Sequence, residues 1–175
     1  MEHQLNGFMK EVFGETVRVI YAQAPHAARG PCPQGIQDGF EWWYASDKES
    51  YDDGWRGSQG LEESLGVLRK MLADQKFDGV VGFSQGGGMA HALLSEGLVS
   101  RGLLFSPVGP TVPVWPMHTK EDSLSNVIMI RDPSDVTTAG YAVDGAEVFE
   151  HSKGHVIPNP STLVDLDIIT KSLMK

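Results

Sequence analysis

The chain has 175 residues, of which 41% are hydrophobic, and its formal net charge is -9, from 14 basic and 23 acidic side chains. This length and hydrophobic content predict a single domain, residues 1–175, with a sizeable core. An acidic chain without a cluster of Lys or Arg is not expected to bind nucleic acid or an anionic membrane. A small neutral or apolar molecule is the expected partner, and no sequence feature indicates an oligomeric state.

Nothing in the sequence points to a membrane or to an oxidising compartment. No apolar run approaches the roughly 18 residues that cross a bilayer, and the first residues, M-E-H-Q, lack the pattern of a secretory signal. Cys32 is the only cysteine, so an intrachain disulfide is excluded. Its position between two prolines favours an incidental loop thiol over a catalytic one. We therefore expect a soluble, cytoplasmic protein.

Helical and extended patterns alternate along the chain. Apolar residues recur at helical spacing in residues 5–13, and Gly14 is expected to end this helix. Residues 17–21 alternate and are rich in β-branched side chains, which predicts a strand. The later predicted elements are an amphipathic helix at 61–75, strands at 80–83, 101–106, 126–130 and 147–151, and a closing helix at 161–174 with Ser161 as N-cap. A further helix is predicted after the turn at residue 84, with apolar residues at helical spacing between Met89 and Leu98. This alternation predicts an α/β fold with a mostly parallel sheet flanked by helices.

Three of the four tryptophans lie in two segments that are rich in Gly, Pro or both. Trp42 and Trp43 belong to residues 27–53, and Trp115 belongs to residues 107–116. Long segments of this kind inside a compact domain are commonly functional, so these three side chains are candidate walls of a substrate pocket. The alternative is that the rings only cover the core.

Residues 77–90 read F-D-G-V-V-G-F-S-Q-G-G-G-M-A, a short apolar strand, a serine between glycines and the start of a helix. A bare G-x-S-x-G pattern is weak, but its strand-turn-helix context predicts a nucleophile elbow. We expect side chains at Gly82 and Gly86 to collide with neighbouring chain in such a turn. The elbow would expose the Ser84 hydroxyl, and the Gln85 N–H at the helix N-terminus would bind an oxyanion.

Two further groups are needed to activate a serine hydroxyl, which is a poor nucleophile near pH 7. Because reactive groups collect at the carboxyl ends of parallel strands, we predict His155 as the base and Asp135 as the acid that orients it. Asp132 is the alternative acid, but it precedes a proline and suits turn initiation. His151 is the rival base, although it falls within a strand pattern. A metal pair of His151 and His155 is disfavoured because its i, i+4 spacing needs a helix, which Gly154 and the β-type run make unlikely.

The chain resembles the FSH-type serine hydrolases, a branch of the α/β-hydrolases that includes the OVCA2-like esterases. The landmarks that carry the resemblance are A-P-H at 24–26, W-W-Y at 42–44, F-D-G-V-V-G-F-S-Q-G at 77–86, the acidic turn ending at Asp135, and G-H-V-I-P at 154–158. The resemblance implies Ser84 as nucleophile, His155 as general base and Asp135 as orienting acid. It also implies hydrolysis of carboxylic esters or thioesters without a cofactor or a metal.

One departure from the family concerns an additional amino-terminal strand, which ends in His-Gly and whose loop supplies a second oxyanion N–H. Nothing in this sequence corresponds to it, so we expect an α/β-hydrolase fold that is shortened at its amino terminus. In that case the strand at 17–21 would pair directly with the strand at 80–83, or the site would be damaged. Losing one oxyanion donor commonly costs about 100- to 1000-fold in turnover.

Two functions from different classes follow. The first is a serine esterase or thioesterase that uses Ser84, His155 and Asp135. The second is a catalytically impaired hydrolase-fold protein that binds a small apolar ligand or a protein partner. A nucleotide-binding α/β protein is disfavoured because the chain lacks a G-x-G-x-x-G start.

Overall fold

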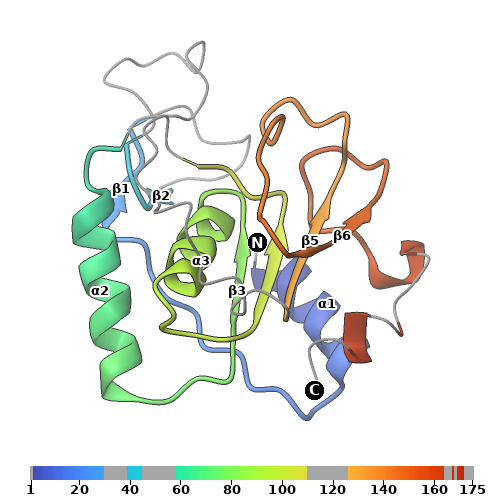
Figure 1. Ribbon diagram of the computed structural model, residues 1–175, viewed down its shortest axis with the longest axis horizontal. Helices are drawn as coiled ribbons and strands as arrows, with labels where there is room; N and C mark the ends of the chain where they lie inside the picture. The colour runs from blue at the N-terminus through green and yellow to red at the C-terminus, as the bar shows by residue number, and fades with distance from the viewer. Residues whose placement is uncertain are drawn as a thin grey trace.

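A four-stranded parallel sheet with the order β3-β4-β5-β6 lies at the centre of the molecule (Figure 1). The structure is a computed structural model that describes residues 2–29, 39–44, 58–109, 126–163, 167 and 169–171. The strands are β3 (Val80–Phe83), β4 (Gly102–Phe105), β5 (Val127–Arg131) and β6 (Glu147–Glu150). All three neighbouring pairs are parallel, which confirms the predicted α/β sheet.

The register of the sheet brings the carboxyl ends of the strands to one edge. Phe83 pairs with Phe105, Phe105 with Ile130, and Ile130 with Phe149. The segments that leave these four strands therefore begin side by side. Polar side chains far apart in the sequence can meet at this edge, as in other open α/β sheets.

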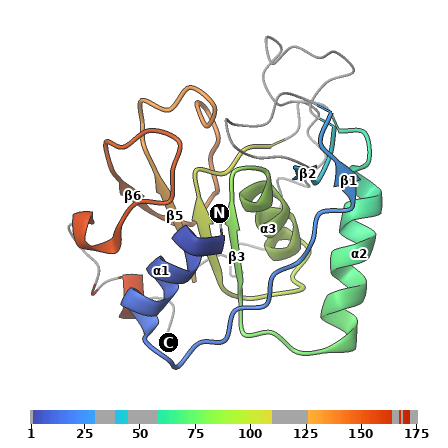
Figure 2. The ribbon, with the colours of Figure 1, turned by 180° about the vertical axis from the view of Figure 1, so that it is seen from behind.

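Helices cover both faces of the sheet. Helix α1 (Glu2–Phe13) lies on one face, and α2 (Leu61–Asp74) and α3 (Gln85–Ser95) lie on the other; Figure 2 shows the molecule from the side of α1. Phe8 of α1 packs edge-on against Phe105 of β4, with ring centroids 4.8 Å apart. These bounds confirm the helices predicted from apolar spacing.

The predicted strand at residues 17–21 does not form. This segment carries no strand assignment, and Val17, Ile20 and Tyr21 each expose between 38% and 39% of their surface. Alternation buries side chains only when the backbone finds a partner strand, and within the described chain β3 pairs with β4 alone. Direct pairing of residues 17–21 with β3, one of the two alternatives considered above, is therefore wrong.

The first strands of the described chain belong to a small second sheet. It consists of β1 (His26–Ala27) and β2 (Phe40–Glu41), which pair in antiparallel fashion. The buried His26 donates a 2.9 Å hydrogen bond from Nε2 to the carbonyl of Gly60, just before α2. This contact joins the small sheet to the start of α2.

The chain beyond residue 158 differs in detail from the prediction. Pro160–Thr162 form a 3-10 turn whose N-cap is Asn159, because its side chain accepts a hydrogen bond from the Ser161 N–H. Ser161 is therefore inside this turn and does not cap it. Residues 167 and 169–171 are helical, as predicted, and the remainder of the expected helix lies outside the described residues.

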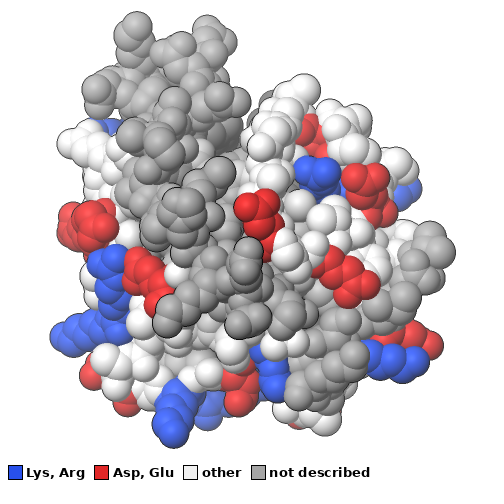
Figure 3. All heavy atoms as spheres, viewed as in Figure 1, with Lys and Arg blue, Asp and Glu red and all other residues white. Residues whose placement is uncertain are grey.

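Charged side chains of both signs are interspersed on the face seen in Figure 3. No helix within the described ranges is long and apolar enough to cross a membrane.

Candidate active site

Ser84 occupies the sharp turn between β3 and α3. Its φ of 55° and ψ of -123° make it one of two described residues other than glycine with a positive φ. The turn is held at both ends, because the Ser84 N–H donates to the Phe105 carbonyl at 3.0 Å and the Ser84 carbonyl accepts from Gly88 and Val108, each at 3.1 Å. A strained backbone fixed in this way is typical of a nucleophile elbow.

The need for glycine is severe at Gly82 and absent at Gly86. A Cβ on Gly82 would lie 2.1 Å from the carbonyl oxygen of Gly86, far inside contact distance. A Cβ on Gly86 would meet only Nε1 of Trp42 at 3.6 Å, an ordinary contact. The predicted collision is thus confirmed for Gly82 and wrong for Gly86, whose missing side chain would point toward Trp42 and not toward the strand.

The next two glycines of the run let α3 approach the segment that follows β4. A Cβ on Gly87 would lie 2.9 Å from Cα and Cβ of Pro107, and one on Gly88 would lie 2.2 Å from the Val108 carbonyl oxygen. Glycines at 87 and 88 therefore permit the close packing that also supplies the Val108 hydrogen bond to Ser84. This need was not predicted.

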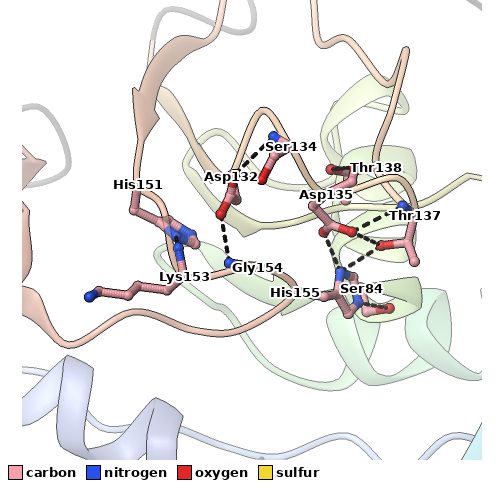
Figure 4. Close-up of polar contacts among 10 residues, drawn as sticks. All are labelled: Ser84, Asp132, Ser134, Asp135, Thr137, Thr138, His151, Lys153, Gly154 and His155. Carbon is pink, nitrogen blue, oxygen red and sulfur yellow. Dashed lines mark hydrogen bonds and ion pairs between the residues drawn. The ribbon is translucent and has the colours of Figure 1, made fainter.

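A chain of hydrogen bonds joins the three predicted catalytic side chains (Figure 4). The Ser84 Oγ lies 3.0 Å from Nε2 of His155, and the His155 Nδ1 lies 2.6 Å from Oδ2 of Asp135. The ring of Phe83 packs beside the imidazole, with centroids 4.9 Å apart. A serine hydroxyl, an imidazole and a carboxylate are thus in contact, which is the arrangement that activation of a serine requires.

The Asp135 carboxylate is nearly inaccessible and fully engaged. Burial acts to raise its pKa, but hydrogen bonds from Thr137 and from His155 outweigh burial, so the pKa lies below its ordinary value of 3.8. The Thr137 hydroxyl donates to Oδ1 at 2.6 Å, and the Thr137 N–H donates to the same oxygen at 3.0 Å. Asp135 is therefore held as a carboxylate facing the imidazole.

Asp132, the alternative acid, has a different set of partners. Its Oδ1 accepts from the N–H and the hydroxyl of Ser134, and its Oδ2 accepts from the Gly154 N–H at 2.6 Å. These bonds, with that of the Ser134 hydroxyl the largest influence, lower the Asp132 pKa to about 2. Asp132 thus binds the backbone next to His155, and Asp135 binds the imidazole.

His151, the rival base, lies outside this chain of contacts. Its Nδ1 accepts a 3.2 Å hydrogen bond from the Lys153 N–H, and burial lowers its pKa. In Figure 4 it lies on the far side of Asp132 from Ser84. Among the described residues, no group of three or more His, Cys, Asp or Glu side chains is arranged to hold a metal ion.

Gln85 is the first residue of α3, so its N–H has no acceptor within the helix. No other described residue accepts from it. The buried Gln85 side chain is engaged elsewhere: its Oε1 accepts from the Trp42 N–H at 2.9 Å, and its Nε2 donates to the Trp43 carbonyl at 3.1 Å. This clamp fixes the tryptophan segment against the elbow.

The three candidate pocket residues have different positions. Trp42 is partly exposed, with its indole beside Gly86 at the start of α3. Trp43 has 0% exposure and belongs to the core cluster against α2 and α3, so it forms no open wall in this structure. Trp115 lies outside the described residues, as does Cys32.

Sequence reasoning missed Thr137 and the partners of Asp132. A signal for both was present, since Asp135 and Asp132 are each followed two residues later by a hydroxyl residue. This spacing favours turns in which the carboxylate accepts from the backbone N–H and hydroxyl of that residue. Both contacts of this kind form here.

Comparison with known proteins gives a consistent result. Residues 1–102 match a protein family described as Serine hydrolase (FSH1). The chain is 25% identical to Esterase OVCA2 of Danio rerio, over 89% of this chain and 83% of that protein, and 24% identical to Esterase CG5412 of Drosophila melanogaster, over 87% and 61%. It is also 26% identical to Rhodanese-like domain-containing protein 6 of Arabidopsis thaliana, over 91% of this chain.

The chain spans about a third of that plant protein, 34% of its length. The family match includes α1, α2 and the elbow at Ser84, and it covers more than half of the chain. The matching family, the parallel sheet flanked by helices and the elbow geometry agree, and the chain belongs to the FSH1 serine hydrolase family of the α/β-hydrolase superfamily.

Proposed function

We propose that this protein cleaves a carboxylic ester or thioester through an acyl-enzyme intermediate on Ser84. The observation that carries the proposal is the pair of contacts at His155, with Nε2 3.0 Å from the serine oxygen and Nδ1 2.6 Å from Asp135. The name esterase of two relatives supports the same reaction class.

The first half of the reaction acylates the serine. The Ser84 Oγ attacks the carbonyl carbon of the substrate while its proton passes to Nε2 of His155. Asp135 accepts a hydrogen bond from Nδ1 and stabilises the imidazolium that forms. When the tetrahedral intermediate collapses, the bond to the alcohol or thiol breaks, and the imidazolium returns the proton to that leaving group.

The second half releases the acid. His155 takes a proton from water, which attacks the acyl carbon, and the collapse of this second intermediate releases the carboxylic acid and regenerates the Ser84 hydroxyl. In both intermediates the oxyanion would accept a hydrogen bond from the Gln85 N–H at the positive end of α3.

Trp42 is the proposed wall of the acyl site. Its backbone N–H is tied to the Gln85 side chain, and its partly exposed indole lies beside Gly86. An aromatic ring next to the elbow favours an apolar acyl group over a charged one.

A second candidate is a weakly active or inactive hydrolase-fold protein that binds a small apolar ligand or a protein partner. The oxyanion site supports this candidate, because α/β-hydrolases bind the oxyanion with two N–H donors. Within the described residues we assign one donor, Gln85, because no strand ending in His-Gly lies beside β3, which pairs with β4 alone.

Covalent labelling with a fluorophosphonate separates the two candidates. We expect folded wild-type protein to be labelled at Ser84, and Ser84→Ala to remain unlabelled. His155→Ala should react at least about 10⁴-fold more slowly, because the serine then lacks its base. Folded wild-type protein that resists the probe would exclude the esterase proposal and leave the binding protein.

Turnover of paired substrates then tests the reaction class. Acyl p-nitrophenyl esters and acyl thioesters of the same chain length would be compared, with release of acid measured for each. Turnover of an ester or a thioester that is lost in Ser84→Ala supports the proposal. Labelling of Ser84 without turnover of any ester or thioester would contradict deacylation by His155.

A further inference from the structure

Thr137 follows the catalytic acid candidate by two residues and makes contacts that the proposed mechanism leaves unexplained. Its hydroxyl donates to Oδ1 of Asp135 at 2.6 Å, and the same oxygen lies 2.7 Å from Nδ1 of His155. Figure 4 shows the hydroxyl between the carboxylate and the imidazole. One hydroxyl thus touches both members of the pair that orients the base.

The geometry determines which imidazole nitrogen carries the proton. A threonine hydroxyl has one hydrogen and further acceptor capacity, and here the hydrogen is directed to Asp135. The Nδ1–H of His155 then lies between two acceptors, Oδ2 of Asp135 at 2.6 Å and Oγ1 of Thr137 at 2.7 Å. Both favour the proton on Nδ1, which leaves the lone pair of Nε2 for the Ser84 hydroxyl.

The Thr137 hydroxyl limits how the Asp135 carboxylate can turn. Asp135 is only 7% exposed, and its Oδ2 is occupied by the imidazole. Without the Thr137 hydroxyl, Oδ1 would keep the Thr137 N–H, and the carboxylate could rotate about its χ2 angle. Thr137 is itself exposed, so water can partly replace its hydroxyl and the loss should be moderate.

We propose that Thr137 is a positioning residue, whose hydroxyl aligns the Asp135 carboxylate and the His155 imidazole so that Nε2 faces Ser84. The inference rests on the proposed function only for its effect on reactivity. The alignment itself is a property of the free protein and can be measured without substrate.

The test compares Thr137→Val, which has nearly the same shape but no hydroxyl, with Thr137→Ser, which restores the hydroxyl. Thr138→Val is the matched control, because the Thr138 hydroxyl donates to the Asp135 backbone carbonyl at 3.2 Å and does not touch the carboxylate. Two quantities would be measured: the rate of fluorophosphonate labelling of Ser84 and the proton NMR resonance of the His155 Nδ1–H.

We expect Thr137→Val to react about tenfold more slowly than wild type and Thr137→Ser to stay within about twofold. The Nδ1–H resonance should move or broaden in Thr137→Val, be retained in Thr137→Ser, and stay at its wild-type position in Thr138→Val. Thermal unfolding checks that each variant is folded. We expect the Thr137 variants to fold, because Thr137 is exposed and substitutions at exposed positions usually change stability little.

The two readouts separate this inference from the proposed function. Wild-type protein that is not labelled, with an Nδ1–H resonance that still depends on the Thr137 hydroxyl, would refute the esterase and support the positioning role. An unchanged resonance in Thr137→Val would overturn the positioning role, whether or not the protein is labelled. An equal loss of labelling in Thr137→Val and Thr138→Val would also overturn it, because the effect would then belong to the whole turn.

Discussion

The two sides of the candidate active site are held by different forces. On the side of Ser84, β3 and α3 meet so closely that backbone atoms leave no room for a side chain at Gly82, and the Val108 carbonyl leaves none at Gly88. On the side of His155, loops after β5 and β6 are joined by hydrogen bonds that the Gly154 N–H donates to Asp132 and that the imidazole donates to Asp135. The serine is fixed by close packing, and the histidine is fixed by hydrogen bonds that its ring and the preceding N–H donate to two carboxylates.

This difference predicts different responses to substitution. Packing at the elbow is continuous with the core, since Met89 to Leu94 of α3 are buried, so a steric error there should destabilise the whole fold. The loops after β5 and β6 align the His155 imidazole and contribute less to core packing. An error there should reduce reactivity while the protein stays folded.

The largest expected effect comes from Gly82→Ala. Its Cβ would lie 2.1 Å from the Gly86 carbonyl oxygen, so β3 and α3 must separate, and we expect the free energy of unfolding to fall by at least about 3 kcal/mol. Denaturant unfolding measures the loss. Gly86→Ala is the control, because its Cβ meets an ordinary 3.6 Å contact, and it should change stability by less than about 1 kcal/mol. Equal losses in both variants would refute the steric account of the elbow.

A smaller effect, and one on reactivity, is expected from Asp132→Ala. This variant frees the Gly154 N–H, to which Oδ2 of Asp132 is bonded at 2.6 Å, and so loosens the backbone that carries His155. Labelling of Ser84 by a fluorophosphonate should slow about tenfold in protein that remains folded. Ser134→Ala removes one of the two donors to the other carboxylate oxygen and should have a smaller effect. Full reactivity in Asp132→Ala would show that the loop needs no such anchor.

Sequence reasoning was most successful where local chemistry and fold agree. The apolar run of β3, the glycines and the small residues that open α3 all belong to one local unit, and this unit forms as predicted around Ser84. The choice between Asp132 and Asp135 also depended on local turn chemistry, and only Asp135 contacts His155. That His155 reaches Ser84 follows from the parallel register, which brings the ends of β3 and β6 to one edge.

Predictions failed where the outcome depends on distant partners. Residues 17–21 have the composition of a strand, but a strand forms only if another strand offers free backbone groups in register. Trp43 and Trp42 are adjacent and chemically identical, yet Trp43 is fully buried in the core and Trp42 is partly exposed beside the elbow. The Gln85 side chain, more than 40 residues away in the sequence, binds the backbone of both. Neither outcome is encoded in the residues nearby.

The smallest expected effect concerns the loss of stability in acid. Asp132 and Asp135 have pKa values below their ordinary 3.8 in the folded protein, that of Asp132 at about 2. The folded state then binds fewer protons than the unfolded state, so the stability contributed by both carboxylates is complete above about pH 4 and is lost as pH falls toward 2. His91 and His151 have pKa values lowered by burial from 6.5, so they begin to reduce stability at higher pH.

Asp132→Asn should therefore lose less stability between pH 4.5 and about 2.5 than wild type, because one titrating group has been removed. Asp74→Asn makes the same change in charge at an exposed position at the end of α2 and should follow the wild-type curve. Urea unfolding at a series of pH values measures both. Parallel curves for wild type and Asp132→Asn would mean that Asp132 does not stabilise the loop as a carboxylate. The hydrogen bond to Gly154 would then be a consequence of the loop conformation and not its cause, and the contrast between a packed serine side and a charge-held histidine side would rest on Asp135 alone.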